Sequence, residues 1–294
     1  MENIGVLVFI DANCYLDFYR IPRGKSLLTF LLEQQDYIFI TKQIVEEVQR
    51  NKLQEAKRFL TKLPEKLAEP DVPIPDHLLK IPGKTADNLH KTLEAIKQKI
   101  QSVKANLKKA TVETLKAISS SEDEVSKALA PLFDRAVAHT PEEIHRARDR
   151  KERGNPPGKQ KDSLGDQLTW EQLLSHCKGK FKLWVISKDS DYCIKHDDKR
   201  FLNPFLYEDL MRLSQTIQEV FCFDNLLKGI EDFVKVTGVK ADQLPTAEES
   251  KEIKEELDTL PPLGWLPQGM DDANYIVLQN IQHARRYRAA FPSQ

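Results

Sequence analysis

The residues Val6–Ile10 form a short, uninterrupted apolar run that ends on Asp11, and Asn13 follows two positions later. An apolar run of this length is typical of a strand that is buried on both faces. In an open parallel sheet, the carboxyl ends of the strands border the crevice where ligands bind. The sequence therefore predicts a rigid strand that presents a carboxylate and an amide at a ligand-binding edge.

Three further segments have the composition of short strands, and helical patterns separate them. The strands are expected at 37–40, 182–187 and 220–223, and helices at 26–34, 42–63, 164–176, 204–213 and 225–236. Strands that alternate with helices favour a parallel sheet with helices on both faces. We therefore predict an α/β fold whose core has a central parallel sheet.

A long helical pattern interrupts this alternation after five prolines between residues 64 and 82. Apolar and small residues then recur in alternating steps of four and three from Leu89 to Thr114, the heptad spacing of a coiled coil. Two more helix starts follow, at 121–124 and 140–143. We predict a helical arm over 64–154, inserted into a core made of 1–63 and 155–238. The heptad seam can pack within the arm, join two copies of the chain or hold a partner protein.

Residues 239–294 are predicted to form a tail outside the core. The chain is acidic from about Ala241 to Asp258, which indicates a solvated linker, and a helix is expected over 273–291 with a basic cluster near its end. No apolar stretch approaches the roughly 20 residues that span a membrane. The first strand has no basic segment ahead of it, so we expect no signal peptide, no membrane partner and a cytoplasmic protein. The four cysteines are far apart and are expected to be free thiols.

Acidic residues lie in four segments where this fold brings strand and helix ends together. They are, in chain order, Asp11, Glu46 and Glu47, Asp162 and Asp166, and Asp189 and Asp191. Taken singly, each has an ordinary structural explanation, such as turn formation or pairing with a helix dipole. Clustered carboxylates, however, repel one another, and their hard oxygen atoms suit Mg²⁺ or Mn²⁺. One or two such ions can polarise a phosphodiester and activate a water molecule, so the set predicts metal-dependent phosphodiester hydrolysis.

These segments resemble the acidic motifs of the PIN-domain nucleases. They read Ile10-Asp11-Ala12-Asn13, Val45-Glu46-Glu47-Val48, Ser163-Leu164-Gly165-Asp166 with Trp170-Glu171, and Val185-Ile186-Ser187-Lys188-Asp189-Ser190-Asp191-Tyr192. The likeness is greatest to bacterial members with a helical insertion, and it covers about 4–63 and 155–238. It implies a three-layer α/β/α core and metal-dependent cleavage of RNA, less often of structured DNA. It also implies a role as a toxin or in phage defence.

The resemblance further implies roles for individual residues. The catalytic, metal-ligating acids would be Asp11, Glu47, Asp166 and Asp189, with Asp191 as an additional acid. Glu47 is preferred to Glu46 because an apolar residue follows it directly and an arginine comes two positions further on, as in many family members. Asn13 would orient Asp11 or a bound water, and the Ser187 hydroxyl would hold a carboxylate.

A nuclease must also attract phosphates, and the net charge of -1 means that any such surface is local. Residues 84–161 contain 17 Lys and Arg against 11 Asp and Glu. We predict that seven of these cations contact a nucleic-acid backbone: Arg146, Arg148, Arg150, Lys151, Arg153, Lys159 and Lys161. The alternative is a solvated helix face.

Two other functions stay open at this point. The pair Asp189 and Asp191 offers ligands for a second metal, which favours a structure-specific DNA nuclease. A non-catalytic nucleic-acid-binding or scaffold protein could have the same fold, although such a protein has no physical reason to keep several carboxylates that repel one another.

Overall fold

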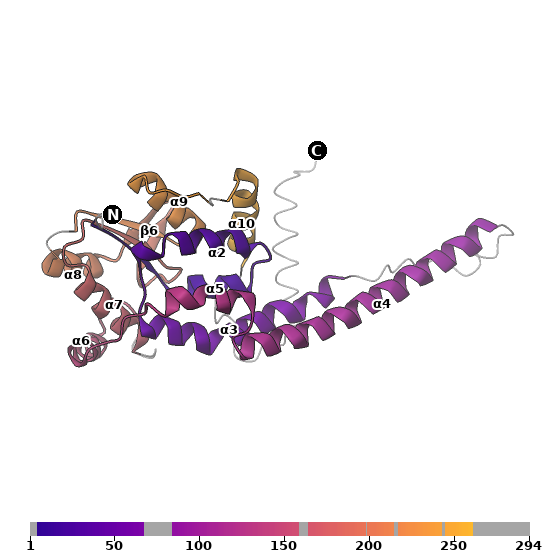
Figure 1. Cartoon of the computed structure of the whole chain (residues 1–294), viewed down its shortest axis with the longest axis horizontal. Coiled ribbons are helices and arrows are strands. Elements are labelled where there is room, and N and C mark those ends of the chain that lie inside the picture. Colours follow the sequence, from indigo (N-terminus) through magenta and orange to yellow (C-terminus); the bar gives the residue numbers. More distant parts are fainter. Residues whose placement is uncertain are drawn as a thin grey trace. The chain divides into compact units, whose positions relative to one another are not determined.

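The computed structural model describes residues 5–67, 84–158, 164–197, 199–214, 217–242 and 245–260. Four parallel strands form the central sheet in the order β2-β1-β3-β6. Figure 1 shows the whole chain, with the edge strand β6 labelled. They are β1 (Val6–Ile10), β2 (Ile38–Phe39), β3 (Lys182–Ile186) and β6 (Glu219–Phe223). The predicted α/β fold with a parallel sheet is confirmed, and the four short apolar segments all form strands of this sheet.

Helices connect these strands close to where the sequence predicts them. The described helices are α1 (Ala12–Leu16), α2 (Gly24–Glu33), α3 (Lys42–Lys62), α4 (Lys84–Ser119), α5 (Glu124–Phe133), α6 (Pro141–Glu152), α7 (Gly165–His176), α8 (Pro204–Ser214), α9 (Leu226–Thr237) and α10 (Ala247–Thr259). Thr41 caps α3 through its side chain, and Thr140 and Glu143 form a reciprocal capping box at the start of α6. These caps fix where the two helices begin.

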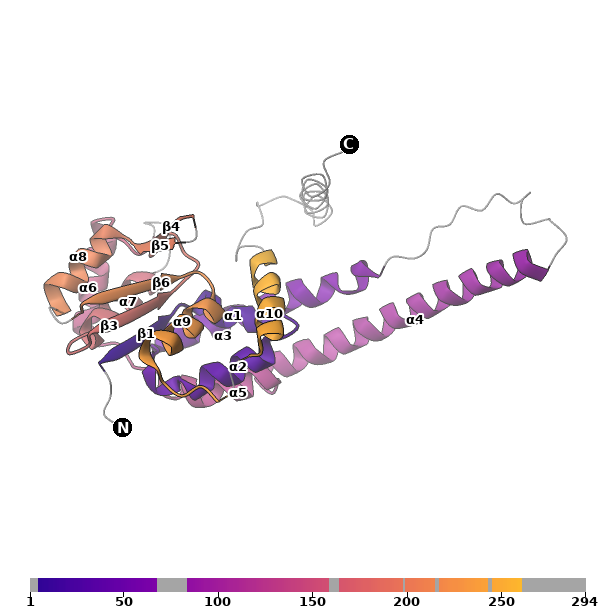
Figure 2. The same cartoon turned by 90° about the horizontal axis from the view of Figure 1, so that it is seen from above.

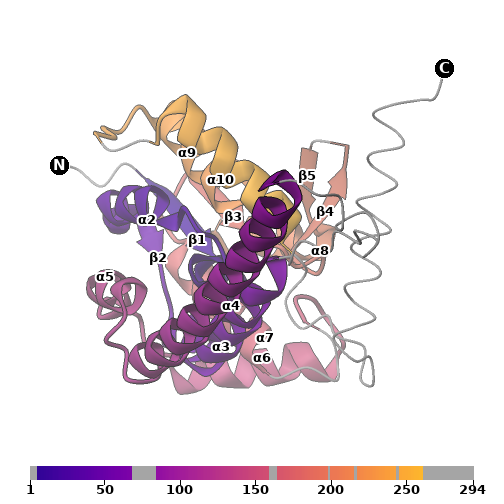
Figure 3. The same ribbon diagram turned by 90° about the vertical axis from the view of Figure 1, so that its right-hand side faces the viewer.

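Helices cover both faces of the sheet, which gives the core three layers (Figure 3). On one face, the Trp184 ring of β3 stacks on Phe221 and packs edge-on against Phe233 of α9. On the other face, Phe9 of β1 contacts Tyr192, which in turn contacts Trp170 of α7. Successive residues of a strand point to opposite faces, so a strand between two helical layers must be apolar throughout. This explains the uninterrupted apolar run of β1.

The helical insertion is shorter than the sequence predicts. The helix α4 is confirmed, and it runs away from the sheet beyond the end of α3 (Figure 2). In contrast, α5 and α6 pack on the core, where Leu129, Leu132 and Ala147 are fully buried. A bridge between Thr41 and Val137 also joins the connection between α5 and α6 to the chain after β2. The arm predicted over 64–154 therefore ends near 119, and 124–152 belong to the core.

The acidic segment near residue 250 is a helix and not the solvated linker that its composition indicates. In α10, Ile253 is fully buried, and Arg23 pairs with Glu252 at 3.0 Å and with Glu256 at 2.9 Å. The buried residues Ile253 and Leu257 lie on one side of the helix. The acidic residues lie on the other sides, where they face solvent or pair with Arg23. The helix predicted over 273–291 lies outside the described residues.

Residues 193–202 form a two-stranded antiparallel hairpin, in a part of the chain where no strand is predicted from the sequence. Its strands are β4 (Cys193–His196) and β5 (Lys199–Leu202), and most of their side chains are exposed. Each strand has four residues, and its two apolar residues are adjacent in the sequence, so neither strand shows apolar alternation. All four cysteines are free thiols, as expected. Within the described ranges, no helix is long and apolar enough to cross a membrane.

A buried ion-pair network joins three helices next to the sheet. The guanidinium of Arg150 (α6) donates to Glu171 (α7) at 2.8 Å, to Asp209 (α8) at 2.6 Å and to the backbone carbonyl of Pro156 at 2.8 Å. The side chain of Arg150 is only 7% exposed, and those of Glu171 and Asp209 are exposed by 5% and 3%. A guanidinium can satisfy several acceptors in fixed directions, so this residue sets the relative positions of α6, α7 and α8.

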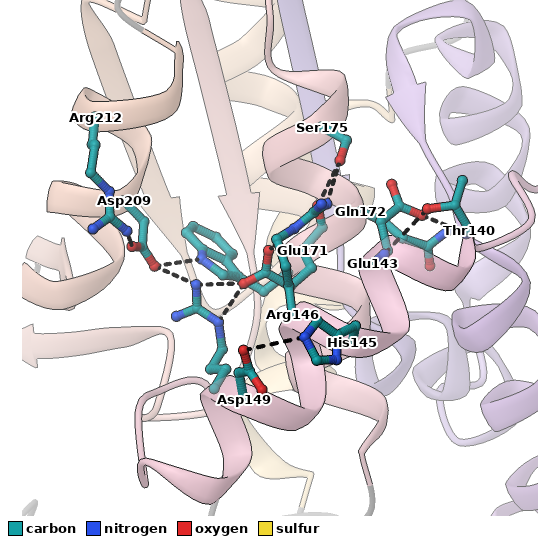
Figure 4. Close-up of polar contacts among 12 residues, drawn as sticks. Thr140, Glu143, His145, Arg146, Asp149, Glu171, Gln172, Ser175, Asp209 and Arg212 are labelled. Carbon is teal, nitrogen blue, oxygen red and sulfur yellow. Dashed lines mark hydrogen bonds and ion pairs between the residues drawn. The ribbon is translucent and has the colours of Figure 1, made fainter.

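Other residues extend this network. Arg146 donates to the second oxygen of Glu171 at 2.9 Å, and Arg212 pairs with the second oxygen of Asp209 at 2.7 Å (Figure 4). The indole of Trp170 also lies 3.4 Å from Asp209. The prediction that Arg150 contacts nucleic acid is therefore wrong, because its charge is neutralised in the interior. Its position between Arg148 and Lys151, which are both accessible to solvent, gives no indication of its buried partners.

We expect the Arg150→Met variant to be less stable than the wild type by about 3 kcal/mol, because it removes the buried guanidinium and leaves Glu171 and Asp209 with only the more exposed Arg146 and Arg212 as partners. Urea unfolding measured by circular dichroism gives this difference. The matched control is Arg148→Met, an exposed arginine of the same helix, which should change stability by less than about 0.5 kcal/mol. Equal stability of the two variants would contradict the structural role of Arg150.

Candidate active site

A hydroxyl group connects the ends of the two central strands. Ser187 follows β3, and its Oγ donates to Oδ2 of Asp11 at 3.0 Å while accepting the backbone N–H of Asp189 at 3.1 Å. The backbone N–H of Asp11 donates to the carbonyl of Ile186 at 3.0 Å, so the β1–β3 ladder continues to the site. The parallel register thus places Asp11 beside the turn that carries Asp189.

Asn13 and Asp191 make further contacts with Asp11 and Asp189. Asn13 lies with its amide nitrogen 3.4 Å from Oδ2 of Asp11, a long contact, and it is half-buried. Oδ1 of Asp189 accepts the backbone N–H of Asp191 at 2.9 Å, which closes a local turn. Asp191 therefore contributes at least its backbone to the shape of the site. Its role as an additional metal ligand stays a prediction.

The α3 helix brings one of its two adjacent glutamates to the site. Glu46 is 61% exposed and lies 3.7 Å from Arg50 on the solvent side. Glu47 is half-buried, and its pKa is raised to about 7, first by burial and then by the charges of Asp166 and Asp189. The helix thus turns Glu47, and not Glu46, toward the other acids. This orientation is consistent with the preference for Glu47 over Glu46 as a metal ligand, which stays a prediction.

Asp166 lies in the first turn of α7, and a glycine packs against it. Gly158 has a φ of +86°, and a Cβ atom at this position would come 3.3 Å from Oδ2 of Asp166 and 2.5 Å from the amide nitrogen of Gln167. A larger residue would therefore be strained and would displace the start of α7. The carbonyl of Pro156 also accepts a hydrogen bond from Arg150, so residues 156–158 contact both α6 and α7.

Burial and mutual repulsion perturb the acids of this site. The pKa of Asp11 is raised to about 7, mainly by burial, with further increases from the charges of Glu47 and Asp189. The hydrogen bond from Ser187 acts in the opposite direction, because it stabilises the ionised form. Carboxylates from β1, α3, α7 and the turn after β3 therefore interact in one region, as the sequence analysis predicts.

The phenol of Tyr192 lies among the same acids, and the sequence analysis did not include it in the site. Tyr192 is 1% exposed, and its hydroxyl is 3.5 Å from the backbone carbonyl of Asp166. Its pKa is raised well above the ordinary value, first by burial and then by the charges of Asp166, Asp11, Asp189 and Glu47. A neutral aromatic ring thus forms the apolar floor under the carboxylates. In the sequence, only its position directly after Asp191 indicates that Tyr192 lies near the acids.

The donor chemistry of these residues fits a hard divalent cation. Carboxylate oxygens are the ligands that Mg²⁺ and Mn²⁺ prefer, and a cation would remove the repulsion that raises the pKa of Asp11 and Glu47. The geometry is not that of a closed metal site: within the ranges that the structure describes, no three His, Cys, Asp or Glu side chains are close enough to hold an ion. Side-chain movements would be needed to bring three of these oxygens onto one ion.

The predicted nucleic-acid contacts fall into three groups. Arg148 and Arg153 are exposed and Lys151 is half-buried, so all three are accessible on or next to α6. Arg146 and Arg150 are engaged with Glu171, although Arg146 is still 45% exposed. Lys159 and Lys161, like Asp162, lie outside the described residues.

One comparison with known proteins gives a match. The family model described as a PIN domain matches residues 8–192, well over half of the chain and a span that contains the five predicted acids. No curated protein and no solved structure matches the chain.

The raised pKa values predict how stability changes with pH. The pKa of Asp11 and Glu47 is about 7 in the folded protein but about 4 in an unfolded chain, so the native state binds protons more tightly. The stability that these groups contribute is complete below about pH 4 and is lost as the pH rises through about 7. In chelator, we expect the Asp11→Asn/Glu47→Gln variant to exceed the wild type in stability by on the order of 2 kcal/mol at pH 8, and by much less at pH 5.

Urea unfolding at pH 5, 6, 7 and 8 tests this expectation, and Glu46→Gln is the control for the loss of an exposed carboxylate on the same helix. The difference between Glu46→Gln and the wild type should stay nearly constant with pH. Addition of Mn²⁺ at pH 8 should stabilise the wild type and not the double variant, since only the wild type keeps the ligand set. A stability gap that does not change with pH would show that the pKa values of the two acids are not raised in the folded protein.

Proposed function

This chain belongs to the PIN-domain family, whose members are generally nucleases that typically use divalent metals, and we propose that it is a Mg²⁺- or Mn²⁺-dependent endoribonuclease. The carboxylates of Asp11, Glu47, Asp166 and Asp189 would hold one or two ions, with Asp191 as an additional ligand. When bound, the metal supplies activation of a water molecule and neutralisation of charge on the phosphodiester.

The observation that carries this proposal is the mutual perturbation of the acids. The pKa of Asp11 and of Glu47 is raised to about 7, first by burial and then by the charges of other carboxylates that lie close to them. An arrangement of this kind destabilises the metal-free protein, and strongly perturbed acids in one place are typical of functional sites. Ser187 orients Asp11 through a hydrogen bond, and Arg150 holds the helix that carries Asp166.

RNA is the substrate that we propose, since cleavage of RNA is what the resemblance implies and is frequent among PIN domains. Arg148, Lys151 and Arg153 support binding of a phosphate backbone next to the acids, because they are accessible at the end of α6. A role as a toxin or in phage defence rests on the likeness of the motifs to bacterial members of the family. It would require that the activity be restrained in the cell.

We expect Asp11→Asn and Asp166→Asn to lower the rate of RNA cleavage by about 100-fold or more, because each removes a ligand of the proposed metal. The measurement incubates the purified variants with panels of single-stranded RNA, structured RNA and structured DNA, in Mg²⁺, Mn²⁺ or chelator. Glu46→Gln is the matched control, since it neutralises the exposed neighbour of Glu47, and its rate should stay within about twofold of the wild type.

The same experiment separates the alternatives. Metal-dependent cleavage of structured DNA alone would replace the proposal with a DNA nuclease. Binding of RNA without cleavage in any metal would identify a non-catalytic binding protein. Chelator-resistant activity that is equal in all variants would indicate a contaminating nuclease and would remove the support for an enzyme.

A further inference from the structure

A pocket of about 480 Å³ lies next to the acidic site. Its walls come from three helices and one connection: Arg50 of α3, His139 before α6, Ile144 and Arg148 of α6, and Leu164 and Leu168 at the start of α7. The volume is within the range of about 300–1,000 Å³ that is usual for pockets that bind small organic groups. The lining residues thus come from parts of the chain that are far apart in the sequence.

The pocket and the acids share two structural elements. Gln43, which also lines the pocket, Glu47 and Arg50 follow one another along α3 in steps of four and three, so they lie on the same face of the helix. Gly165 lines the pocket as well, and Asp166 is the next residue. The charge of Arg50 also lowers the pKa of Glu47, which places the guanidinium close to that carboxylate. A group bound in the pocket would therefore be adjacent to two of the acids.

The lining combines cationic and aliphatic groups. Arg50 and Arg148 offer guanidinium groups, and His139 offers an imidazole that can donate or accept a hydrogen bond. Among the described residues that line it, none is acidic. Ile144, Leu164 and Leu168 supply an apolar surface, of which Leu168 is almost fully buried. Guanidinium groups recognise phosphate, and an aliphatic surface suits the flat face of a base or a sugar.

The cations of this pocket are available for a ligand. Arg148 is exposed, and it forms no hydrogen bond or ion pair with the residues that the structure describes. Arg50 has only a weak contact of 3.7 Å with the exposed Glu46, and surface pairs of this kind contribute little. In contrast, Arg150, two positions from Arg148, is fully committed to buried carboxylates. The helix α6 therefore divides its arginines between a structural side and a binding side.

From this combination, we infer that the pocket binds one nucleotide of a single-stranded RNA, adjacent to the phosphodiester that the acids would cleave. The phosphate lies against Arg50 and Arg148, and the base or ribose packs on Ile144, Leu164 and Leu168. The inference rests on the proposed nuclease function for its position in the reaction, but binding of the strand does not require cleavage. Such a pocket would select where along the strand the enzyme cuts.

Binding can be tested with intact RNA. We expect Arg148→Ala to weaken the affinity for a fluorescent 12-nucleotide single-stranded RNA by about tenfold in chelator, measured by fluorescence anisotropy. The slope of log K against log salt concentration should also become less steep by about 0.7, the value for the loss of one phosphate contact on a single strand. The matched control is Arg135→Ala, an exposed arginine that pairs with Asp36 and does not line the pocket, and it should leave both quantities unchanged.

A scan with single abasic nucleotides locates the bound base. In the wild type, one position of the 12-nucleotide RNA should lose about tenfold in affinity when its base is removed, and this loss should vanish in Ile144→Ala. Thermal unfolding checks that Ile144→Ala is folded. Equal affinity and salt slope for Arg148→Ala and Arg135→Ala, or an affinity that is insensitive to every abasic position, would overturn the inference.

The outcome also separates this inference from the proposed function. If the wild type fails to cleave RNA in Mg²⁺ or Mn²⁺ while Arg148→Ala still loses affinity, the pocket stands and the nuclease proposal fails. If the wild type cleaves RNA and Arg148→Ala binds and cleaves like the control, the nuclease proposal stands and the pocket does not bind the strand.

Discussion

Repulsion between buried carboxylates is the constraint around which this structure is built. Asp11 is buried and Glu47 is half-buried. Burial first, and then the charges of nearby acids, raise the pKa of each to about 7. Without support, side chains of like charge would turn away from one another. The surrounding structure prevents this by fixing the backbone on which each acid is placed.

Each acid is fixed by a different kind of contact. Asp11 ends a strand that is hydrogen-bonded on both sides, and Ser187 holds its carboxylate. Asp166 lies on α7, which the buried guanidinium of Arg150 ties to α6 and α8. Glu47 projects from α3, a helix of 21 residues that begins at a well-defined cap. The sheet, the ion-pair network and the capped helix α3 thus each oppose the electrostatic repulsion at a different acid.

Much of this arrangement is predictable from the sequence, because it depends on local patterns. The strands follow from short apolar runs, and the start of α3 follows from the capping chemistry of Thr41. The order of strands and helices places Asp11 and Asp189 at one edge, since parallel strands end there together. None of these steps requires knowledge of a contact between distant segments.

Other features depend on such contacts, and the sequence analysis missed them. Arg150 looks like its exposed neighbours, and only the meeting with Glu171 and Asp209, 21 and 59 positions away, makes it a buried residue. The acids of α10 suggest a linker because composition does not reveal that Ile253 is buried against the core. Similarly, α5 and α6 follow directly on the helical pattern of α4, so the sequence places them in the arm. Their apolar sides pack on α2 and α7 of the core, and these contacts are not visible in the sequence. Tyr192 carries no charge, so a search for acids overlooks it.

The pairing of β1 with β3 has a consequence for the order in which the protein is made. Asp11 and Ser187 are 176 positions apart, and at about 5–20 residues per second a ribosome needs roughly 9–35 s to add the intervening chain. For the last part of that interval, the emerging polypeptide has Asp11, Glu47 and helix α6 but no complete β3 against which to align them. The acids can converge only once the last member of the set has left the ribosome, so a truncated or unfinished chain has no complete site.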